Sequence, residues 1–221
     1  EIWLGEAKAN NSGAELSLSF GHNMRRDGSL DPKRITPLVY TPEGTTLTPS
    51  LTLNEDHYLI KFSADGDGYY TAVVDLSAVV ISQTADGHQI GPKHQFKNVT
   101  YAGSFHQMAK RIIPIGEAGE FKGNLVHGIL EIVPVNPRIG VNGEAELKVY
   151  YEGQPLPAAE VKAVSQKEEK DIWTMKTDEE GVARGPITTD GEWMFLVRHR
   201  DPSKKASDEF DETVFVNTLV M

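Results

Sequence analysis

The 221-residue sequence contains no cysteine, which excludes disulfide bonds and zinc–thiolate sites. It also lacks a long apolar run. The longest candidate, residues 71–81, is interrupted by Asp75 and Ser77 and is shorter than the roughly 18 residues needed to cross a bilayer. Basic patches are missing too, and a net charge of −10 repels nucleic acid. We therefore expect neither nucleic-acid binding nor direct membrane insertion.

Sequence motifs of common catalytic centres are also absent. There is no His-Glu-x-x-His, no Gly-x-Ser-x-Gly and no phosphate-binding glycine loop. The run Asp65-Gly66-Asp67-Gly68 matches part of a calcium loop but lacks its closing Glu, so we interpret it as a hairpin turn. Because no nucleophile, base and orienting group occur together in a motif, we expect a protein that is not an enzyme.

Short alternating segments make up most of the first part of the chain. Residues 16–20 and 58–62 alternate apolar and polar side chains, which is typical of half-buried strands. Turn signals such as Asp86-Gly87 separate these segments. Residues 105–112 fit helical spacing as well, so they form either one short helix or a strand.

A second set of strands follows the connector Pro134-Val135-Asn136-Pro137, whose prolines favour an extended, poorly paired chain. Residues 147–151 and 193–197 alternate, and turns lie between such segments. About seven strands in about 85 residues are spaced as in an immunoglobulin-like or transthyretin-like sandwich. We predict an all-β fold of two tandem immunoglobulin-like or transthyretin-like β-sandwich domains, residues 1–134 and 135–221.

The start of the chain indicates its location. There is no initiator Met, and Glu1-Ile2-Trp3-Leu4 already has the pattern of a strand. We interpret this as a mature chain whose signal peptide has been removed, although a chain trimmed at this point would look the same. This interpretation places the protein in the periplasm or otherwise outside the cytoplasm.

Histidines are the candidate binding residues, because neutral imidazole is a usual ligand of nickel, cobalt, copper and zinc. His22 continues the apolar face of residues 16–20, so we expect it on the inward face at the rim of the sandwich. A hairpin of the first two strands would bring it near the amino terminus. His88 and His94 share a polar loop, and His106 follows soon after. This loop either closes over an ion or is an ordinary exposed loop.

Short motifs along nearly the whole chain carry a resemblance to a known family. They are Glu1-Ile2-Trp3-Leu4, Phe20-Gly21-His22 followed by Pro37 and Thr41-Pro42-Glu43-Gly44, Ala109-Lys110-Arg111 near Gly116, and His127-Gly128-Ile129-Leu130-Glu131-Ile132-Val133-Pro134 with Asn136-Pro137. The chain resembles the bacterial periplasmic family of unknown function often described as a nickel or cobalt uptake component. Members commonly have a His just before the position of Glu1, which this sequence lacks. The resemblance implies that His22 and His127 belong to a metal site.

The leading hypothesis is an extracytoplasmic accessory protein that binds divalent nickel or cobalt for an uptake system, with a membrane metal transporter as its partner. Its candidate ligands are His22, His127, His88, His94 and His106. The alternative is a non-catalytic interaction or adhesion module at the cell envelope. Histidines that converge favour metal binding, and histidines that lie far apart favour the interaction module. Sugar stacking on tryptophan is a weaker third hypothesis, because Trp193 alternates with Phe195 and Val197 as a core residue does.

Overall fold

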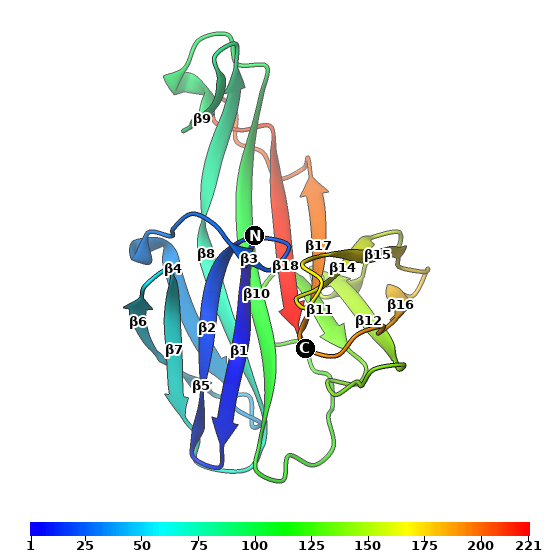
Figure 1. The fold of residues 1–221 in the computed structure, drawn as a ribbon. Helices are drawn as coiled ribbons and strands as arrows, with labels where there is room; N and C mark the ends of the chain where they lie inside the picture. Colours follow the sequence, from blue (N-terminus) through cyan, green and yellow to red (C-terminus); the bar gives the residue numbers. More distant parts are fainter.

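The structure, a computed structural model, describes residues 1–221 and confirms the all-β prediction (Figure 1). Apart from strands it contains only two short 3-10 turns, η1 (Pro32–Arg34) and η2 (Lys93–Gln95). None of its helical segments has the length and apolar character needed to cross a membrane.

The strands form three sheets. The five-stranded sheet has the order β1 (Ile2–Asn10), β2 (Gly13–His22), β7 (His57–Ser63) and β6 (Ser50–Asn54), with β3 (Arg25–Arg26) paired to the end of β2. The nine-stranded sheet has the order β15 (Lys170–Lys176), β14 (Glu160–Ser165), β17 (Trp193–Asp201), β18 (Glu212–Val220), β10 (Tyr101–Ile115), β8 (Gly68–Thr84), β4 (Ile35–Tyr40) and β5 (Thr46–Leu47), with β9 (Gly87–Ile90) paired to β8. The four-stranded sheet contains β11 (Leu130–Pro134), β12 (Glu144–Tyr151), β13 (Gln154–Pro155) and β16 (Val182–Pro186).

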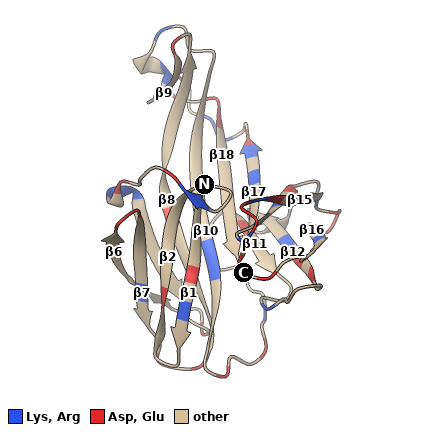
Figure 2. Cartoon of the chain, in the orientation of Figure 1, with Lys and Arg blue, Asp and Glu red and all other residues tan.

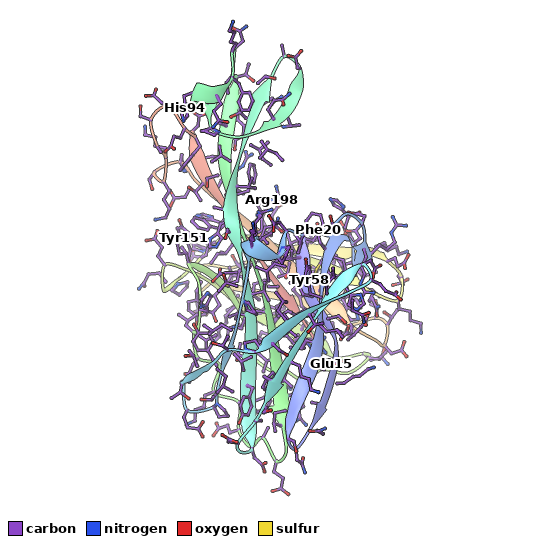
Figure 3. The ribbon with its side chains drawn as sticks, turned by 90° about the vertical axis from the view of Figure 1, so that its left-hand side faces the viewer. Glu15, Phe20, Tyr58, His94, Tyr151 and Arg198 are labelled. Atoms are coloured by element: carbon purple, nitrogen blue, oxygen red, sulfur yellow. The ribbon has the colours of Figure 1, made fainter.

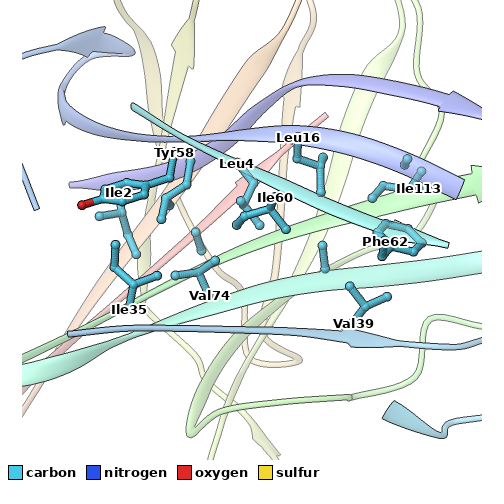
Figure 4. Close-up of a cluster of buried hydrophobic side chains, with 14 of the residues drawn as sticks. Ile2, Leu4, Leu16, Ile35, Val39, Tyr58, Ile60, Phe62, Val74 and Ile113 are labelled. Carbon is cyan, nitrogen blue, oxygen red and sulfur yellow. The ribbon is translucent and has the colours of Figure 1, made fainter. Parts of the chain in front are cut away.

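The first hydrophobic core lies between the five-stranded sheet and the β4, β8 and β10 part of the nine-stranded sheet. It contains 18 buried residues. Successive side chains of a strand point to opposite faces, so the alternation in β2 and β7 places every second residue in this core. Figure 4 shows Leu16 and Ile60 from one sheet together with Val74 and Ile113 from the other.

The second core has 14 buried residues and lies between the four-stranded sheet and strands β14, β17 and β18. Trp193, Phe195 and Val197 of β17 are at most 2% exposed, as their alternation predicts. Trp193 is therefore a core residue and is not available for stacking on a sugar.

One sheet runs through both halves of the molecule. β10 of the first half pairs in parallel with β18, from Gly103 opposite Glu212 to Arg111 opposite Val220. The segment 101–115 is thus a strand, which settles the choice between helix and strand. The division into residues 1–134 and 135–221 stays a prediction, but β11 contributes Leu130 and Ile132 to the second core. The chain therefore passes from one core to the other before Leu130.

Two long strands project beyond the first sandwich. β8 and β10 are 17 and 15 residues long, and with β9 and η2 their outer halves form an extension, residues 77–105 (Figure 1). The predicted turn at Asp86-Gly87 joins β8 to β9. Backbone bonds from Lys93 and His94 to Glu209 and Asp208 connect the extension to the loop before β18.

Candidate functional site

The most concentrated group of polar side chains surrounds Asp75, in the middle of β8. Val74 and Leu76 point into the first core, so Asp75 points to the opposite face of the sheet. The Nε2 atom of His106 lies 3.2 Å from Oδ1 of Asp75, and the Nε2 atom of His127 contacts Oδ2. Two imidazoles from different segments therefore meet one carboxylate.

Local structure explains how these residues meet. Asp75 lies opposite Met108 of β10 in the sheet, and a register shift between Phe105 and Gln107 falls at His106. Tyr40, at the end of the neighbouring strand β4, places its hydroxyl 2.6 Å from Nδ1 of His127. His127 itself lies in the irregular segment that precedes β11.

A buried ion pair fixes the segment that carries His127. The Nζ atom of Lys110 lies 2.7 Å from the carboxylate of Glu131, and these side chains are only 2% and 3% exposed. The Lys110 ammonium also donates to the carbonyl of Ile132, at 3.0 Å. Glu131 in turn accepts bonds from the backbone N–H groups of Val126 and His127. The position of His127 is thus tied to β10 through two charged side chains that are almost fully buried.

The charges set the protonation states of the cluster. The hydrogen bond to Asp75 raises the pKa of His127, and this effect outweighs burial, which lowers it. Burial acts to raise the pKa of Asp75, but the imidazoles of His127 and His106 leave it well below its usual range. The pKa of Tyr40 is raised by burial and by the negative charges of Asp75 and Glu131. The cluster can therefore hold a proton on His127 beside an ionised Asp75, whereas Tyr40 remains a neutral phenol and is not activated as a nucleophile.

Two hollows give solvent access to this cluster. A pocket of about 260 Å³ is lined by His127, Gly128 and Glu131 among others. A larger cleft of about 860 Å³ is lined by Tyr40, Lys110 and the segment 118–126. A small ligand can therefore approach His127 from the pocket and Tyr40 from the cleft.

Of the five predicted histidines, only His106 and His127 come together. His22 does lie beside the amino terminus, since the Glu1 amine donates to the carbonyl of Gly21 at 2.8 Å. The expectation that His22 faces inward is wrong, because its side chain is 70% exposed and contacts Asp27 at 2.8 Å. The physical reason is that the end of β2 leaves the core to pair with β3.

The other two predicted histidines belong to the extension. His88 lies on β9 and His94 in η2. Figure 3 shows His94 in the upper part of the molecule, on the extension. Neither histidine contributes an ion pair to the Asp75 cluster. As the side chains stand, no group of three or more His, Cys, Asp or Glu residues is arranged so that it could hold a metal ion.

Reasoning from the sequence missed Asp75, Tyr40 and the Lys110–Glu131 pair. A signal for Asp75 was present, because a single carboxylate interrupts the apolar residues 71–81. Charged residues within a strand that is otherwise buried are rarely left unpaired, so Asp75 called for cationic or hydrogen-bonding partners. Nothing in the spacing of the sequence indicated which residues those partners were.

The fold and the site define a class: an all-β protein of two sandwiches joined by a common sheet, with a partly buried His–Asp–His cluster near the junction. The chain belongs to the family DUF4198, a domain of unknown function, whose model matches residues 1–201. No curated protein matches it.

Two similar solved structures are the D0–D1 domain of intimin and native alpha-2-macroglobulin from Escherichia coli spanning domains MG0-NIE-MG1. The intimin structure is 11% identical, with 100% of this chain and 97% of that chain covered and a TM-score of 0.26. The macroglobulin structure is 9% identical, with 96% and 94% covered and a TM-score of 0.25.

Proposed function

We propose that the protein is an extracytoplasmic, periplasmic accessory protein that binds a divalent transition-metal ion, nickel or cobalt, at the Asp75 cluster for an uptake system. The observation that carries this proposal is that the Nε2 atoms of His106 and His127 both lie beside the carboxylate of Asp75, His127 in a hydrogen bond to Oδ2 and His106 at 3.2 Å from Oδ1. Two imidazoles and one carboxylate form a donor set suited to nickel and cobalt.

Binding requires a rearrangement of this cluster. As the side chains stand, both imidazoles lie against Asp75, so the three side chains do not surround an open point. A metal ion has to replace the proton shared between His127 and Asp75, because imidazole binds metals only when that nitrogen is deprotonated. With Nε2 bound to the ion, Nδ1–H of His127 would donate to the hydroxyl of Tyr40, which holds the ring in place.

Competition between the metal and the proton predicts a pH dependence. The pKa of His127 is raised by Asp75, so the proton competes already at neutral pH. Affinity should fall about tenfold per pH unit below the pKa of His127. An affinity for nickel that is constant between about pH 5 and 8 would contradict histidine ligation.

A calorimetric titration with nickel tests the proposed site. We expect His106→Ala and His127→Ala each to weaken binding at least about tenfold, because each variant removes one of three protein ligands. His88→Ala is the matched control on the extension and should bind as the unaltered protein does. Loss of binding only in His22→Ala would move the site to the amino terminus, and no binding by the unaltered protein would refute a metal site altogether.

A second candidate function is a non-catalytic interaction module at the cell envelope. The specific observation in its favour is the extension of residues 77–105, which projects beyond the first sandwich (Figure 1) and carries Ile90, a residue that is 78% exposed. Loops and edges held by a rigid scaffold commonly form binding surfaces. If nickel does not bind, this function remains, and His22, His88 and His94 are then surface residues.

A further inference from the structure

The edge of the five-stranded sheet at β6 is open. β6 pairs only with β7, in a regular register from Ser50 opposite Lys61 to Asn54 opposite His57. No backbone hydrogen bond from a loop or turn reaches the N–H and C=O groups of β6 that point away from β7. The opposite edge differs at its start, because Thr218 donates to the carbonyl of Ile2 at 2.7 Å and the first four residues of β1 are buried. In Figure 1, β6 lies at the outer side of the first sandwich.

Within its five residues β6 carries no charge, proline or bulge to prevent strands from pairing; Pro49 and Glu55 flank it. Exposed edges usually carry charged residues, proline or a bulge, each of which blocks the addition of another strand. β6 reads Ser-Leu-Thr-Leu-Asn and has none of these, in a chain of which 24% is charged (Figure 2). Leu51 packs in part against the first core, whereas Leu53 is 64% exposed.

The sequence of β6 is complementary to itself. If two copies pair antiparallel about Thr52, then Leu51 of one copy lies opposite Leu53 of the other. Ser50 then lies opposite Asn54, and the two Thr52 residues face each other. The acidic turn Glu55-Asp56 meets Pro49 and Thr48 of the second copy, so no like charges are brought opposite one another.

We propose that β6 is a dimerisation strand, which joins the five-stranded sheets of two copies of this chain across a two-fold axis. The exposed Leu53 gains an apolar neighbour, and the outer N–H and C=O groups of β6 gain partners. The interface is small compared with the roughly 1,200 Å² of a stable complex, so the dimer is weak and concentration-dependent. Each copy carries a charge of −10, and added salt therefore strengthens association by screening the repulsion.

Sedimentation equilibrium over a range of protein concentrations tests the proposal. We expect the unaltered protein to show a reversible monomer–dimer equilibrium, and Leu53→Lys to shift it at least about tenfold toward monomer. Ile90→Lys is the matched control, since Ile90 is an exposed apolar residue on the edge strand β9. A monomer at all concentrations would overturn the proposal, and so would association that Ile90→Lys abolishes and Leu53→Lys leaves unchanged.

The absence of native cysteine allows a second test that is independent of these variants. Thr52→Cys places two thiols directly opposite each other across the two-fold axis, at a separation of Cα atoms that a disulfide can span. Mild oxidation should link Thr52→Cys into a dimer much faster than Ile90→Cys. Equal rates for the two variants would overturn the proposed register even if the protein dimerises by another surface.

Discussion

Replacement of Lys110 by Met is the sharpest test of how the two halves are joined. Lys110 on β10 and Glu131 on β11 form an ion pair that is almost fully buried, and burial lowers the pKa of the lysine while Glu131 raises it. In Lys110→Met the carboxylate stays buried without its cation. It retains only the N–H donors of Val126 and His127.

The magnitude follows from the cost of a buried charge without a partner. Removing one member of such a pair typically destabilises a protein by about 3–5 kcal/mol. For a protein of this length, that loss corresponds to a decrease in Tm of roughly 6–20 °C. The double variant Lys110→Met/Glu131→Gln removes both charges, and its amide oxygen can still accept a bond from the His127 segment. It should therefore regain most of the lost stability, because neutral replacements of a buried pair are often near neutral in free energy.

Urea unfolding followed by tryptophan fluorescence measures these changes, since Trp173 and Trp193 report on the second sandwich. Trp3 of β1 reports on the contact between the two halves, because it packs against Val164, Met194 and Val220. A loss of less than about 1 kcal/mol in Lys110→Met, within the range of exposed pairs, would refute the conclusion that this pair is buried and costly to break. If the double variant is no more stable than Lys110→Met, the unpaired charge of Glu131 is not the cause of the lost stability. The loss would then come from the packing of the lysine side chain.

Two further predictions concern the Asp75 cluster. Because the folded pKa of His127 is raised, the His127–Asp75 pair contributes stability that is fully present below about pH 6.5 and is lost as pH rises through the folded pKa of His127. Urea unfolding at several pH values should show this decrease in the unaltered protein but not in Asp75→Asn. Tyr40→Phe removes the partner of His127 Nδ1 and should weaken nickel binding about tenfold in calorimetry. Tyr101→Phe, in the outer part of the extension, is its control and should leave the affinity for nickel unchanged.

Much of the fold could be predicted from local patterns. The alternation of Leu16, Leu18 and Phe20 correctly predicts strand β2, and that of Trp193, Phe195 and Val197 correctly predicts a buried face of β17. Such patterns work because burial of one face requires a period of two. The alternation wrongly predicts an inward-facing His22, because the end of β2 leaves the core to pair with β3.

The pairing of strands and the site could not be predicted in the same way. Alternation tells which face of a strand is buried, but it does not tell which strand lies beside it. The parallel pairing of β10 with β18 therefore had no signal in the sequence. The Asp75 cluster was unpredictable for the same reason. It contains Tyr40, Asp75, His106 and His127, which come from separate segments that only the order of the strands brings together.

The parallel pairing of β10 with β18 also constrains how the chain folds. β18 follows every other strand in the sequence, and it supplies Phe215 and Leu219 to the second core. A nascent chain that ends before Glu212 therefore leaves one edge of β10 without its partner and the second sandwich without two of its core residues. Contacts of such high sequence separation form slowly, because a long loop must close before any of its contacts can form. Until then the chain exposes an unpaired strand edge of the kind through which chains aggregate.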